Sequence, residues 1–199
     1  MKTILTFLLL LVSTLVYSQE YIQGPSIPNT DHVWLDAETL EITYIKLRKP
    51  EFVSLRSHEE WLKDKLGSHE EVGFVLIERI RDYVKQSHYR YQQTFKGYPV
   101  EGSQYIINKY KGKISSINGN FTNIIYTNPI KINKSEAYLI AKEEIPMGEL
   151  GTESNQPKLV IFNYILCYKF DIFYPETQVS VYVYINAETG KIANKIRQY

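Results

Sequence analysis

The 199-residue sequence contains a single cysteine, Cys167, so the chain cannot form an intramolecular disulfide and must rely on a buried core for stability. It also lacks an excess of charge of either sign, because 23 lysines and arginines stand against 22 aspartates and glutamates. A neutral balance argues against binding to nucleic acid or to an acidic membrane, since both partners call for a basic surface.

Catalytic motifs are missing as well. His-Glu-Glu occurs at 58–60 and at 69–71, but the zinc motif H-E-x-x-H would need histidine where the sequence has Leu62 and Gly73. There is no G-x-S-x-G, no glycine-rich phosphate loop and no C-x-x-C pair. Cys167 lies in an apolar stretch, where a small buried side chain is the expected role. The sequence therefore predicts a non-enzymatic chain without metal or cofactor.

The first eighteen residues have the pattern of a secretory signal peptide. Lys2 precedes an apolar run of 13 residues from Ile4 to Val16, and Ser18 supplies the small residue at the expected cleavage site before Gln19. The run is shorter than the roughly 20 residues of a membrane-spanning helix, and no later segment approaches that length. We expect a secreted or extracytoplasmic protein with no membrane attachment once the signal is removed.

Aromatic residues are abundant, with 17 tyrosines and eight phenylalanines, and they favour β structure. Tyr89 with Tyr91, and Tyr182 with Tyr184, stand at alternate positions along two expected strands. Such rows could be stacking platforms for bases or sugars. Packing on a sheet face is the favoured interpretation, because the chain has no basic stripe.

Two helices are expected from capping boxes, in which a small polar residue and a glutamate three positions later satisfy each other's backbone N–H groups. Ser57 and Glu60 predict a helix over 57–66, ended by Gly67 in a left-handed conformation. The stretch 133–136 (NKSE) opens a second helix, with Ala137, Ile140, Ala141 and Ile145 facing inward and Pro146 as its end.

Strands account for most of the remainder. Polar and apolar residues alternate over 88–95, which is the period of a strand, whereas 73–83 fits a strand or a helix equally well. Glycine-containing turns then predict an antiparallel meander. Its further strands are expected at 103–109 and 113–121, and those of the C-terminal part at 158–162, 166–173, 179–185 and 191–196.

The stretch HYRYQQTFKGYPVEG, residues 88–102, resembles the propeptide of thermolysin-like zinc metalloproteases. In that family the block has the pattern H-x-R-[YF]-x-Q-x-[YF]-x-G-x-P-V-x-G and ends in a strand with an Asn-Gly-like sequence. We expect Gly97 to take a positive φ and Gly102 to allow a close strand approach. The matching positions are His88, Arg90, Tyr91, Gln93, Gly97, Pro99, Val100, Gly102, Asn118 and Gly119.

The C-terminal part resembles the PepSY-type module that follows in such propeptides. VYVYINAETGKI, residues 181–192, is similar to its closing hairpin V-D-A-x-T-G, with Asn186 in place of aspartate and Gly190 at the glycine. The resemblance covers about residues 50–196. It implies an α+β fold of two small antiparallel-sheet units, each packed with a helix, in a cystatin-like propeptide architecture. The implied division is a signal at 1–18, an N-terminal extension at 19–50, a propeptide-type meander unit at 51–127 and a PepSY-like unit at 128–199.

The resemblance also implies a function. The chain would be a non-catalytic inhibitor and folding chaperone of a secreted thermolysin-like metalloprotease, and its partner would be the protease catalytic domain. It would act in cis as the pro-segment of a longer zinc metalloendopeptidase zymogen, or in trans. The end of the chain would point toward the catalytic cleft, through Lys195, Ile196, Arg197, Gln198 and Tyr199. The alternative is a stand-alone extracytoplasmic binding or structural module that shares the fold and has no protease partner.

Overall fold

The computed structural model describes residues 20–84, 86–143, 149–150 and 157–198. It contains twelve strands, two α-helices and one short 3-10 helix within those residues. In chain order they are β1 (Tyr21–Gln23), β2 (Thr30–Asp36), β3 (Ile42–Glu51), η1 (Leu55–Ser57), α1 (His58–Leu66), β4 (Val72–Arg81), β5 (Gln86–Phe95), β6 (Tyr98–Tyr110), β7 (Lys113–Gly119), α2 (Lys134–Glu143), β8 (Glu149–Leu150), β9 (Lys158–Phe162), β10 (Ile165–Tyr174), β11 (Val179–Asn186) and β12 (Ile192–Arg197).

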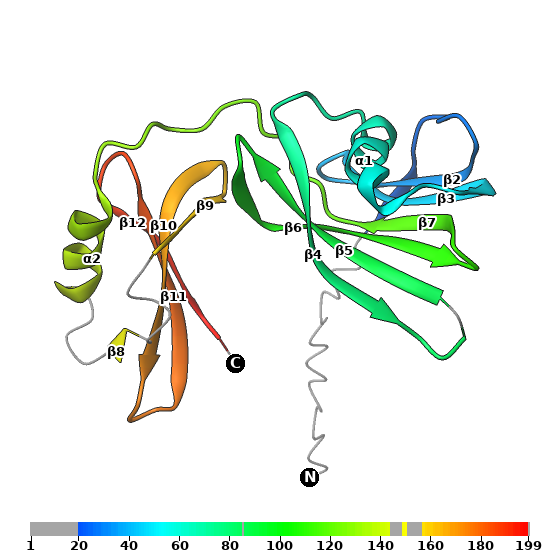
Figure 1. Ribbon diagram of the computed structural model, residues 1–199. Coiled ribbons are helices and arrows are strands. Elements are labelled where there is room, and N and C mark those ends of the chain that lie inside the picture. Colours follow the sequence, from blue (N-terminus) through cyan, green and yellow to red (C-terminus); the bar gives the residue numbers. More distant parts are fainter. Residues whose placement is uncertain (1–19, 85, 144–148, 151–156, 199) are drawn as a thin grey trace, which may run out of the picture.

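The strands form one sheet bent into an arch with two arms (Figure 1). The first arm holds β1 to β7 and α1, and the second holds β8 to β12 and α2. The main path through the sheet runs β1-β2-β3-β7-β6-β9-β10-β11-β12, while β4 and β5 pair beside β6 and β8 pairs with β10. The arms join where β6 and β9 run parallel, with Val100 opposite Ile161, and the other pairs are antiparallel.

The expected fold class, two small antiparallel-sheet units each packed with a helix, is therefore wrong. The molecule is mostly β, with two short helices and one large mixed sheet. Glycine-containing turns predict antiparallel hairpins from local sequence. A parallel pair between strands far apart in the chain has no local sequence motif that would predict it. Residues 20–51 also supply three strands that pair onto β7 through β3.

The alternation over 88–95 is confirmed in β5. Tyr89, Tyr91, Gln93 and Phe95 are all buried, and they face the core of the first arm. The ambiguous stretch 73–83 falls mostly within β4, which pairs antiparallel with β5 from end to end. The turn between β5 and β6 places Lys96 at φ 50° and Gly97 at φ 82°, as a tight hairpin turn requires, so the positive φ expected at Gly97 is confirmed.

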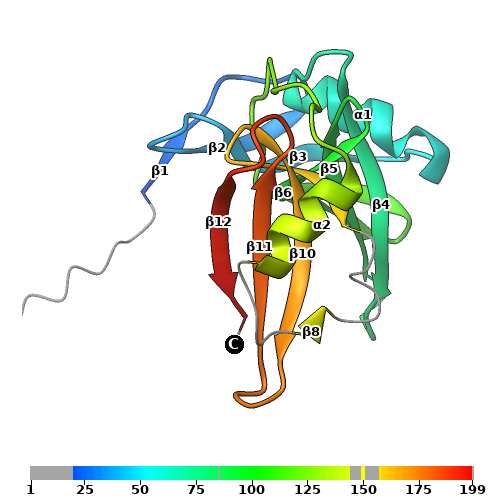
Figure 2. The same cartoon turned by 90° about the vertical axis from the view of Figure 1, so that its left-hand side faces the viewer.

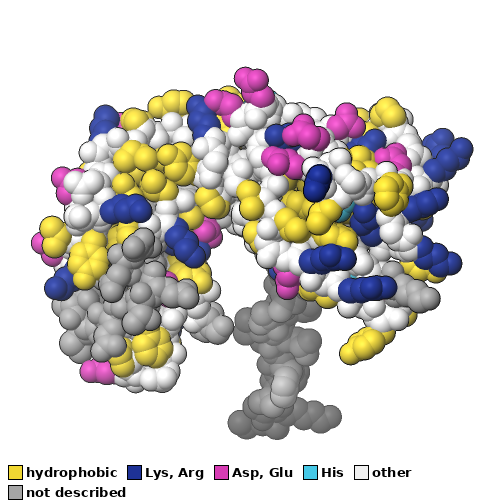
Figure 3. Space-filling model, in the orientation of Figure 1, with side chains coloured by type: hydrophobic (Ala, Val, Ile, Leu, Met, Phe, Trp, Pro, Cys, Tyr) yellow, Lys and Arg dark blue, Asp and Glu magenta, His cyan; other side chains and the backbone are white. Residues whose placement is uncertain are grey.

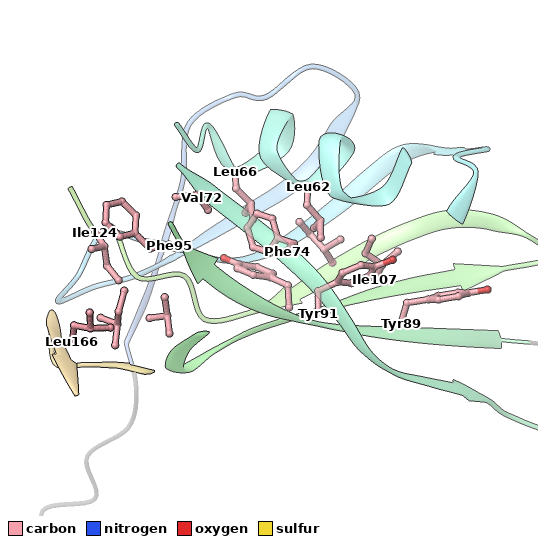
Figure 4. Packing of buried hydrophobic residues seen from close by; sticks show 14 of the residues in the cluster. Leu62, Leu66, Val72, Phe74, Tyr89, Tyr91, Phe95, Ile107, Ile124 and Leu166 are labelled. Carbon is pink, nitrogen blue, oxygen red and sulfur yellow. The ribbon is translucent and has the colours of Figure 1, made fainter. Parts of the chain in front are cut away.

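Helix α1 covers one face of the first arm and buries Leu62 and Leu66 against the sheet (Figure 4). Its expected end is confirmed, because Gly67 has φ 62° and its N–H reaches back to the carbonyl oxygens of the last turn. Its expected start is wrong in detail. The Ser57 side chain makes no capping hydrogen bond and instead lies 2.9 Å from the Ser54 hydroxyl.

Helix α2 begins as its sequence predicts. Asn133 Oδ1 accepts from the N–H groups of Ser135 (2.9 Å) and Glu136 (3.0 Å), and Glu136 Oε2 accepts from the Asn133 N–H (2.7 Å). Ala137 and Ala141 are fully buried, facing β10 and β11. Ile140 packs against the same core, whereas Ile145 and Pro146 lie outside the described residues.

The core is shared between the arms. One cluster of buried apolar side chains runs from α1 through the sheet to α2. Figure 4 shows its middle, where Phe95 and Ile124 of the first arm lie beside Leu166 of the second. Since apolar burial is the main force that drives folding, the shared core helps to fix the arms to each other, in addition to the β6–β9 pair.

Candidate functional site

The corner between β5 and β6 is the joint of the arch. Val100 is 2% exposed and lies opposite Ile161 of the second arm. The Gln92 side-chain amide donates to the carbonyl oxygens of Val100 (2.6 Å) and Ser103 (3.0 Å), and so holds the corner to β5. Pro99 pairs with Thr94, where the start of β6 leaves the β5 register. The positions that match the propeptide pattern are called signature residues below. Those at this corner connect the arms.

Two signature glycines are required for different reasons. Gly102 has φ 77°, a left-handed conformation that suits glycine, and a Cβ there would meet nothing within 4 Å. The close approach expected at Gly102 is therefore wrong, and it occurs at Gly119 instead. A Cβ on Gly119 would lie 2.0 Å from the Gln104 carbonyl oxygen and 2.7 Å from the Tyr105 Cα.

Gln93 holds the chain that leaves β7. Its fully buried side chain donates to the Thr122 carbonyl oxygen (2.7 Å) and accepts from the Thr122 N–H (3.0 Å). One glutamine thus satisfies both backbone groups of a residue that lies outside the strands. Its role is structural.

Tyr91 belongs to a buried polar chain that sequence reasoning missed. Its hydroxyl lies 2.7 Å from His58 Nδ1, and His58 Nε2 lies 3.3 Å from Lys109 Nζ. Lys109 Nζ also donates to the Val53 carbonyl oxygen (2.7 Å). Because an ammonium group can only donate, His58 Nε2 must be the acceptor and the ring is neutral. Tertiary folding brings these residues together from the segment between β3 and η1, from α1, from β5 and from β6, so no local motif marks them.

Burial sets the protonation of this chain. His58 is 0% exposed, and burial, assisted by the Lys109 charge, lowers the pKa of its imidazole to about 4. Burial raises the pKa of the Tyr91 hydroxyl to about 12. It lowers the pKa of Lys109, with a smaller contribution from the Arg79 charge. The arrangement stores a neutral histidine in the core and offers no route to a substrate.

The remaining signature residues of the first arm lie on the face of the sheet opposite α1. Arg90, Ile106, Asn118, Tyr44 and Trp34 stand opposite one another across five strands, alternating with the core-facing rows. The Arg90 Nε lies 3.3 Å from Glu78 Oε2, with a geometry that leaves this buried nitrogen without a hydrogen bond in the described chain.

His88 lies one row away on the same face. Its Nδ1 is 2.7 Å from Asn108 Oδ1, and the Asn108 amide nitrogen donates to Asn118 Oδ1 (2.8 Å). Its Nε2 lies 3.6 Å from Asp82 Oδ2. These contacts join β5, β6 and β7 through side chains, so His88 and Asn118 form part of a polar network on the helix-free face.

At the joint, an ion pair links the two arms. Lys169 Nζ of β10 lies 3.0 Å from Glu101 Oε1 of β6, and it sits over the Tyr182 ring at 3.8 Å from the centroid. The Tyr184 hydroxyl donates to Glu101 Oε2 (3.4 Å), and its ring stacks on Phe162 at 4.2 Å. Burial raises the pKa of the Tyr184 hydroxyl above its usual value.

Both tyrosine rows weighed as stacking platforms are therefore occupied by the protein itself. Tyr89 and Tyr91 are core residues, Tyr184 is 2% exposed, and Tyr182 is covered by Lys169. Sheet-face packing, the favoured interpretation, is confirmed. Cys167 is fully buried beside Tyr184, and burial raises the pKa of its thiol to about 12, so it is a small core residue.

The hairpin between β11 and β12 is closed by Asn186. Its Oδ1 accepts from the N–H groups of Glu188 (2.8 Å) and Thr189 (3.0 Å), and Gly190 follows at φ 71°. The expected cleft-directed tail lies mostly in β12, where Lys195, Ile196 and Arg197 pair with β11. The Gln198 N–H donates to the Ser180 carbonyl oxygen (2.8 Å), and Tyr199 lies outside the described residues.

The helices leave one side of each arm uncovered. Figures 1 and 2 show α1 and α2 on the outer sides of the arch, so that helix-free sheet faces line its inside. On the face seen in Figure 3, lysines and arginines gather on the first arm.

Within the described ranges no three His, Cys, Asp or Glu side chains are placed to hold a metal ion. No described helix is long and apolar enough to cross a membrane.

Comparison with known families matches part of the first arm and most of the second. The model of the fungalysin/thermolysin propeptide motif matches residues 72–121, and that of the peptidase propeptide and YPEB domain, PepSY, matches residues 131–195. Together, and in this order, they define a propeptide-type regulatory module, a non-catalytic class that associates with a protease catalytic domain. The chain carries the propeptide region of thermolysin-like proteases. No curated protein matches it.

Proposed function

We propose that this chain is a propeptide-type inhibitor and folding chaperone of a secreted thermolysin-like metalloprotease, acting in cis as a pro-segment or in trans. The observation that carries the proposal is the order of the two family matches, 72–121 followed by 131–195. The first match covers β4 to β7 of the first arm, and the second covers α2 and the strands from β8 into β12. The signal-like first 18 residues support the same location as an exported protease.

The inside of the arch is the surface we assign to the protease domain. It is made of two helix-free sheet faces held at a fixed angle by the shared core and by the pair of Lys169 and Glu101. A standard protein–protein interface buries roughly 1,600 Å² in total and combines an apolar centre with a polar rim. The polar network of His88, Asn108 and Asn118 supplies fixed hydrogen-bonding groups on this face.

The chaperone role follows from mass action. A module that binds the folded protease domain and not its unfolded chain shifts the equilibrium toward the folded state. A rigid arch suits this role, because a preformed surface loses little conformational entropy when it binds. The same contact would inhibit the protease for as long as the arch covers its cleft.

The test mixes residues 19–199 with a thermolysin-like protease domain and follows peptide hydrolysis and recovery of activity from denaturant. We expect saturable inhibition at micromolar concentration and a higher refolding yield. A matched variant, Glu101→Lys, places two positive charges at the joint, because Lys169 lies there. It should weaken both effects if the arch must be rigid. The proposal is overturned if several such proteases show no inhibition and no assisted refolding.

The role of the C-terminal tail has its own experiment. A chain that ends at Arg197 keeps β12 whole, whereas one that ends at Lys191 removes it. If the tail enters the cleft, loss of Gln198 and Tyr199 alone raises the inhibition constant about tenfold, or about 1.4 kcal/mol. If only the longer truncation has an effect, β12 acts as part of the arch and the cleft-directed role of the tail is wrong.

A further inference from the structure

A third row of aromatic residues, which sequence reasoning did not single out, stays open. Trp34 of β2 and Tyr44 of β3 stand opposite each other on the helix-free face, and Tyr21 of β1 lies beside them. Trp34 is 38% exposed and Tyr21 is 50% exposed, in contrast to the closed rows of β5 and β11. His32 stacks on Trp34 with ring centroids 6.3 Å apart and so supports its orientation.

These rings line a pocket of about 490 Å³ together with Thr43, Asn118, Gly119 and Asn120. The volume lies in the range of small-molecule sites, which are mostly apolar with a few placed polar groups. No charged side chain is among the described residues that line it. A charged ligand would find no counter-ion there, so the pocket is suited to a neutral one.

The pocket is an addition to the propeptide fold. Its three aromatic residues lie between residues 21 and 44, before the first family match begins at residue 72. Its amides come from the end of β7, near the close of that match at residue 121. The pairing of β3 with β7 places Tyr44 opposite Asn118 and so brings the two groups together. The N-terminal strands thus supply the aromatic side of the pocket, which lies outside both family matches.

The polar groups fit a ligand rich in hydroxyls. Asn118 Oδ1 accepts from Asn108, while the Asn118 amide nitrogen donates to no residue of the described chain. The exposed Asn120 amide adds a donor and an acceptor, and the Thr43 hydroxyl, which donates to the Trp34 carbonyl oxygen (3.2 Å), can still accept. A purely apolar ligand would leave these groups unpaired, which costs binding free energy. Aromatic faces beside neutral amides match the apolar faces and hydroxyl edges of a sugar ring.

We propose that this pocket binds a neutral carbohydrate. The N-terminal strands would then give the module a second function, attachment of the secreted protein to glycan, through a pocket at the edge of the face that we assign to the protease. The bound ring lies against Trp34 and Tyr21, and the amides of Asn118 and Asn120 bond to its hydroxyls.

Tryptophan fluorescence tests the proposal directly, because the chain has two tryptophans and only Trp34 lines the pocket. The Trp61→Phe variant makes Trp34 the sole reporter. It is titrated with neutral hexasaccharides (cellohexaose, maltohexaose, laminarihexaose and chitohexaose). We expect a saturable change in the Trp34 emission with at least one of them, at a dissociation constant between micromolar and millimolar. Calorimetry on the unmodified chain should give the same constant.

Matched variants locate the site. Trp34→Ala and Asn120→Ala should each weaken the calorimetric affinity about tenfold, or about 1.4 kcal/mol. Tyr110→Ala, which removes a 47% exposed ring elsewhere, should leave it unchanged. Circular dichroism checks that each variant is folded, and Asn120 is exposed enough to be replaced without disturbing the core.

The proposal fails if no saccharide gives a saturable signal at millimolar concentration, or if Tyr110→Ala and Trp34→Ala have equal effects. If Trp34→Ala instead weakens only protease inhibition, the pocket holds a protease side chain and the carbohydrate proposal is overturned. Because the titrations contain no protease, their failure leaves the inhibitor proposal untouched, and the reverse also holds.

Discussion

Each arm of the arch contains a hairpin closed by the same turn. Asp36-Ala-Glu-Thr-Leu-Glu41 joins β2 to β3, and Asn186-Ala-Glu-Thr-Gly-Lys191 joins β11 to β12. In both, the first side chain accepts from the second and third N–H groups that follow it. In both, the first backbone N–H also donates to the carbonyl oxygen of the sixth residue.

The two turns differ mainly at the fifth position. Gly190 has φ 71°, and Leu40 takes nearly the same conformation at φ 59°. A left-handed residue other than glycine costs roughly 1–2 kcal/mol. The turn of the first arm therefore carries backbone strain that the turn of the second arm avoids. Because both turns still form, the Asx side chain and the backbone hydrogen bonds define this turn, and the glycine does not.

The largest expected effect separates the arms by pH, because His58, a buried histidine with a lowered pKa, lies in the first arm. The folded pKa of His58, about 4, lies below its ordinary value of 6.5. The contribution of His58 to stability is therefore fully present above pH 6.5 and is lost as the pH drops toward 4, by up to about 3 kcal/mol. Urea melts across this range should show the loss, and hydrogen exchange should show β4 and β5 losing protection before β10 and β11.

The matched variant for this test is His58→Phe, which cannot titrate and should flatten the pH dependence over the same window. His32→Gln replaces an exposed histidine on β2 and serves as the control, with the pH dependence of the parent chain. An unchanged acid response in His58→Phe would show that carboxylates, and not this imidazole, govern it.

The second effect exchanges the residues that distinguish the turns. Gly190→Leu imposes the strain that Leu40 already bears, and its Cβ would also lie 3.2 Å from Ile140 Cδ1 of α2. We expect a loss of about 1–3 kcal/mol, which lowers the melting temperature by roughly 2–4 °C per kcal/mol. Thermal melts of Gly190→Leu and of the parent chain measure this loss of stability. A variant as stable as the parent would mean that the second turn shifts to another conformation.

The sequence predicted this second turn and missed the first, although both contain Ala-Glu-Thr after an Asx residue. The family pattern includes glycine at the fifth position, so a leucine there hid the repeat within the stretch 19–50. Local patterns did predict the meander, the α2 cap and the positive φ of Gly97. They could not predict the β6–β9 pair, the His58 cluster or the open row at Trp34, because non-local pairing creates all three.

The third effect compares the two Asx side chains. Asn186 Oδ1 also accepts from the Asn128 amide nitrogen (3.3 Å). The Asn128 side chain in turn donates to the Leu166 carbonyl oxygen (3.3 Å) and accepts from the Leu166 N–H (2.6 Å). Asn186→Ala should therefore cost about 1–2 kcal/mol and Asp36→Ala about 0.5–1 kcal/mol. Chemical denaturation measures both. Asn186→Asp should keep most of the stability, since Asp36 holds the same turn, and a full loss in that variant would contradict the equivalence of the two turns.

The smallest effect has the opposite sign. Leu40→Gly removes the left-handed strain, worth roughly 1–2 kcal/mol, but adds the backbone freedom that glycine has in the unfolded chain, roughly 0.5–1 kcal/mol. The Leu40 side chain is 62% exposed, so its loss gives up little buried area. We expect a net gain of about 0.5 kcal/mol, seen as a higher urea midpoint with an unchanged slope. Leu40→Ala is the control, because it shortens the side chain without relieving the strain and should not stabilise the protein. If both variants lose stability alike, Leu40 contributes through its apolar contacts in the groove beside Leu35 and Leu66, and strain at the turn is not the governing difference between the arms.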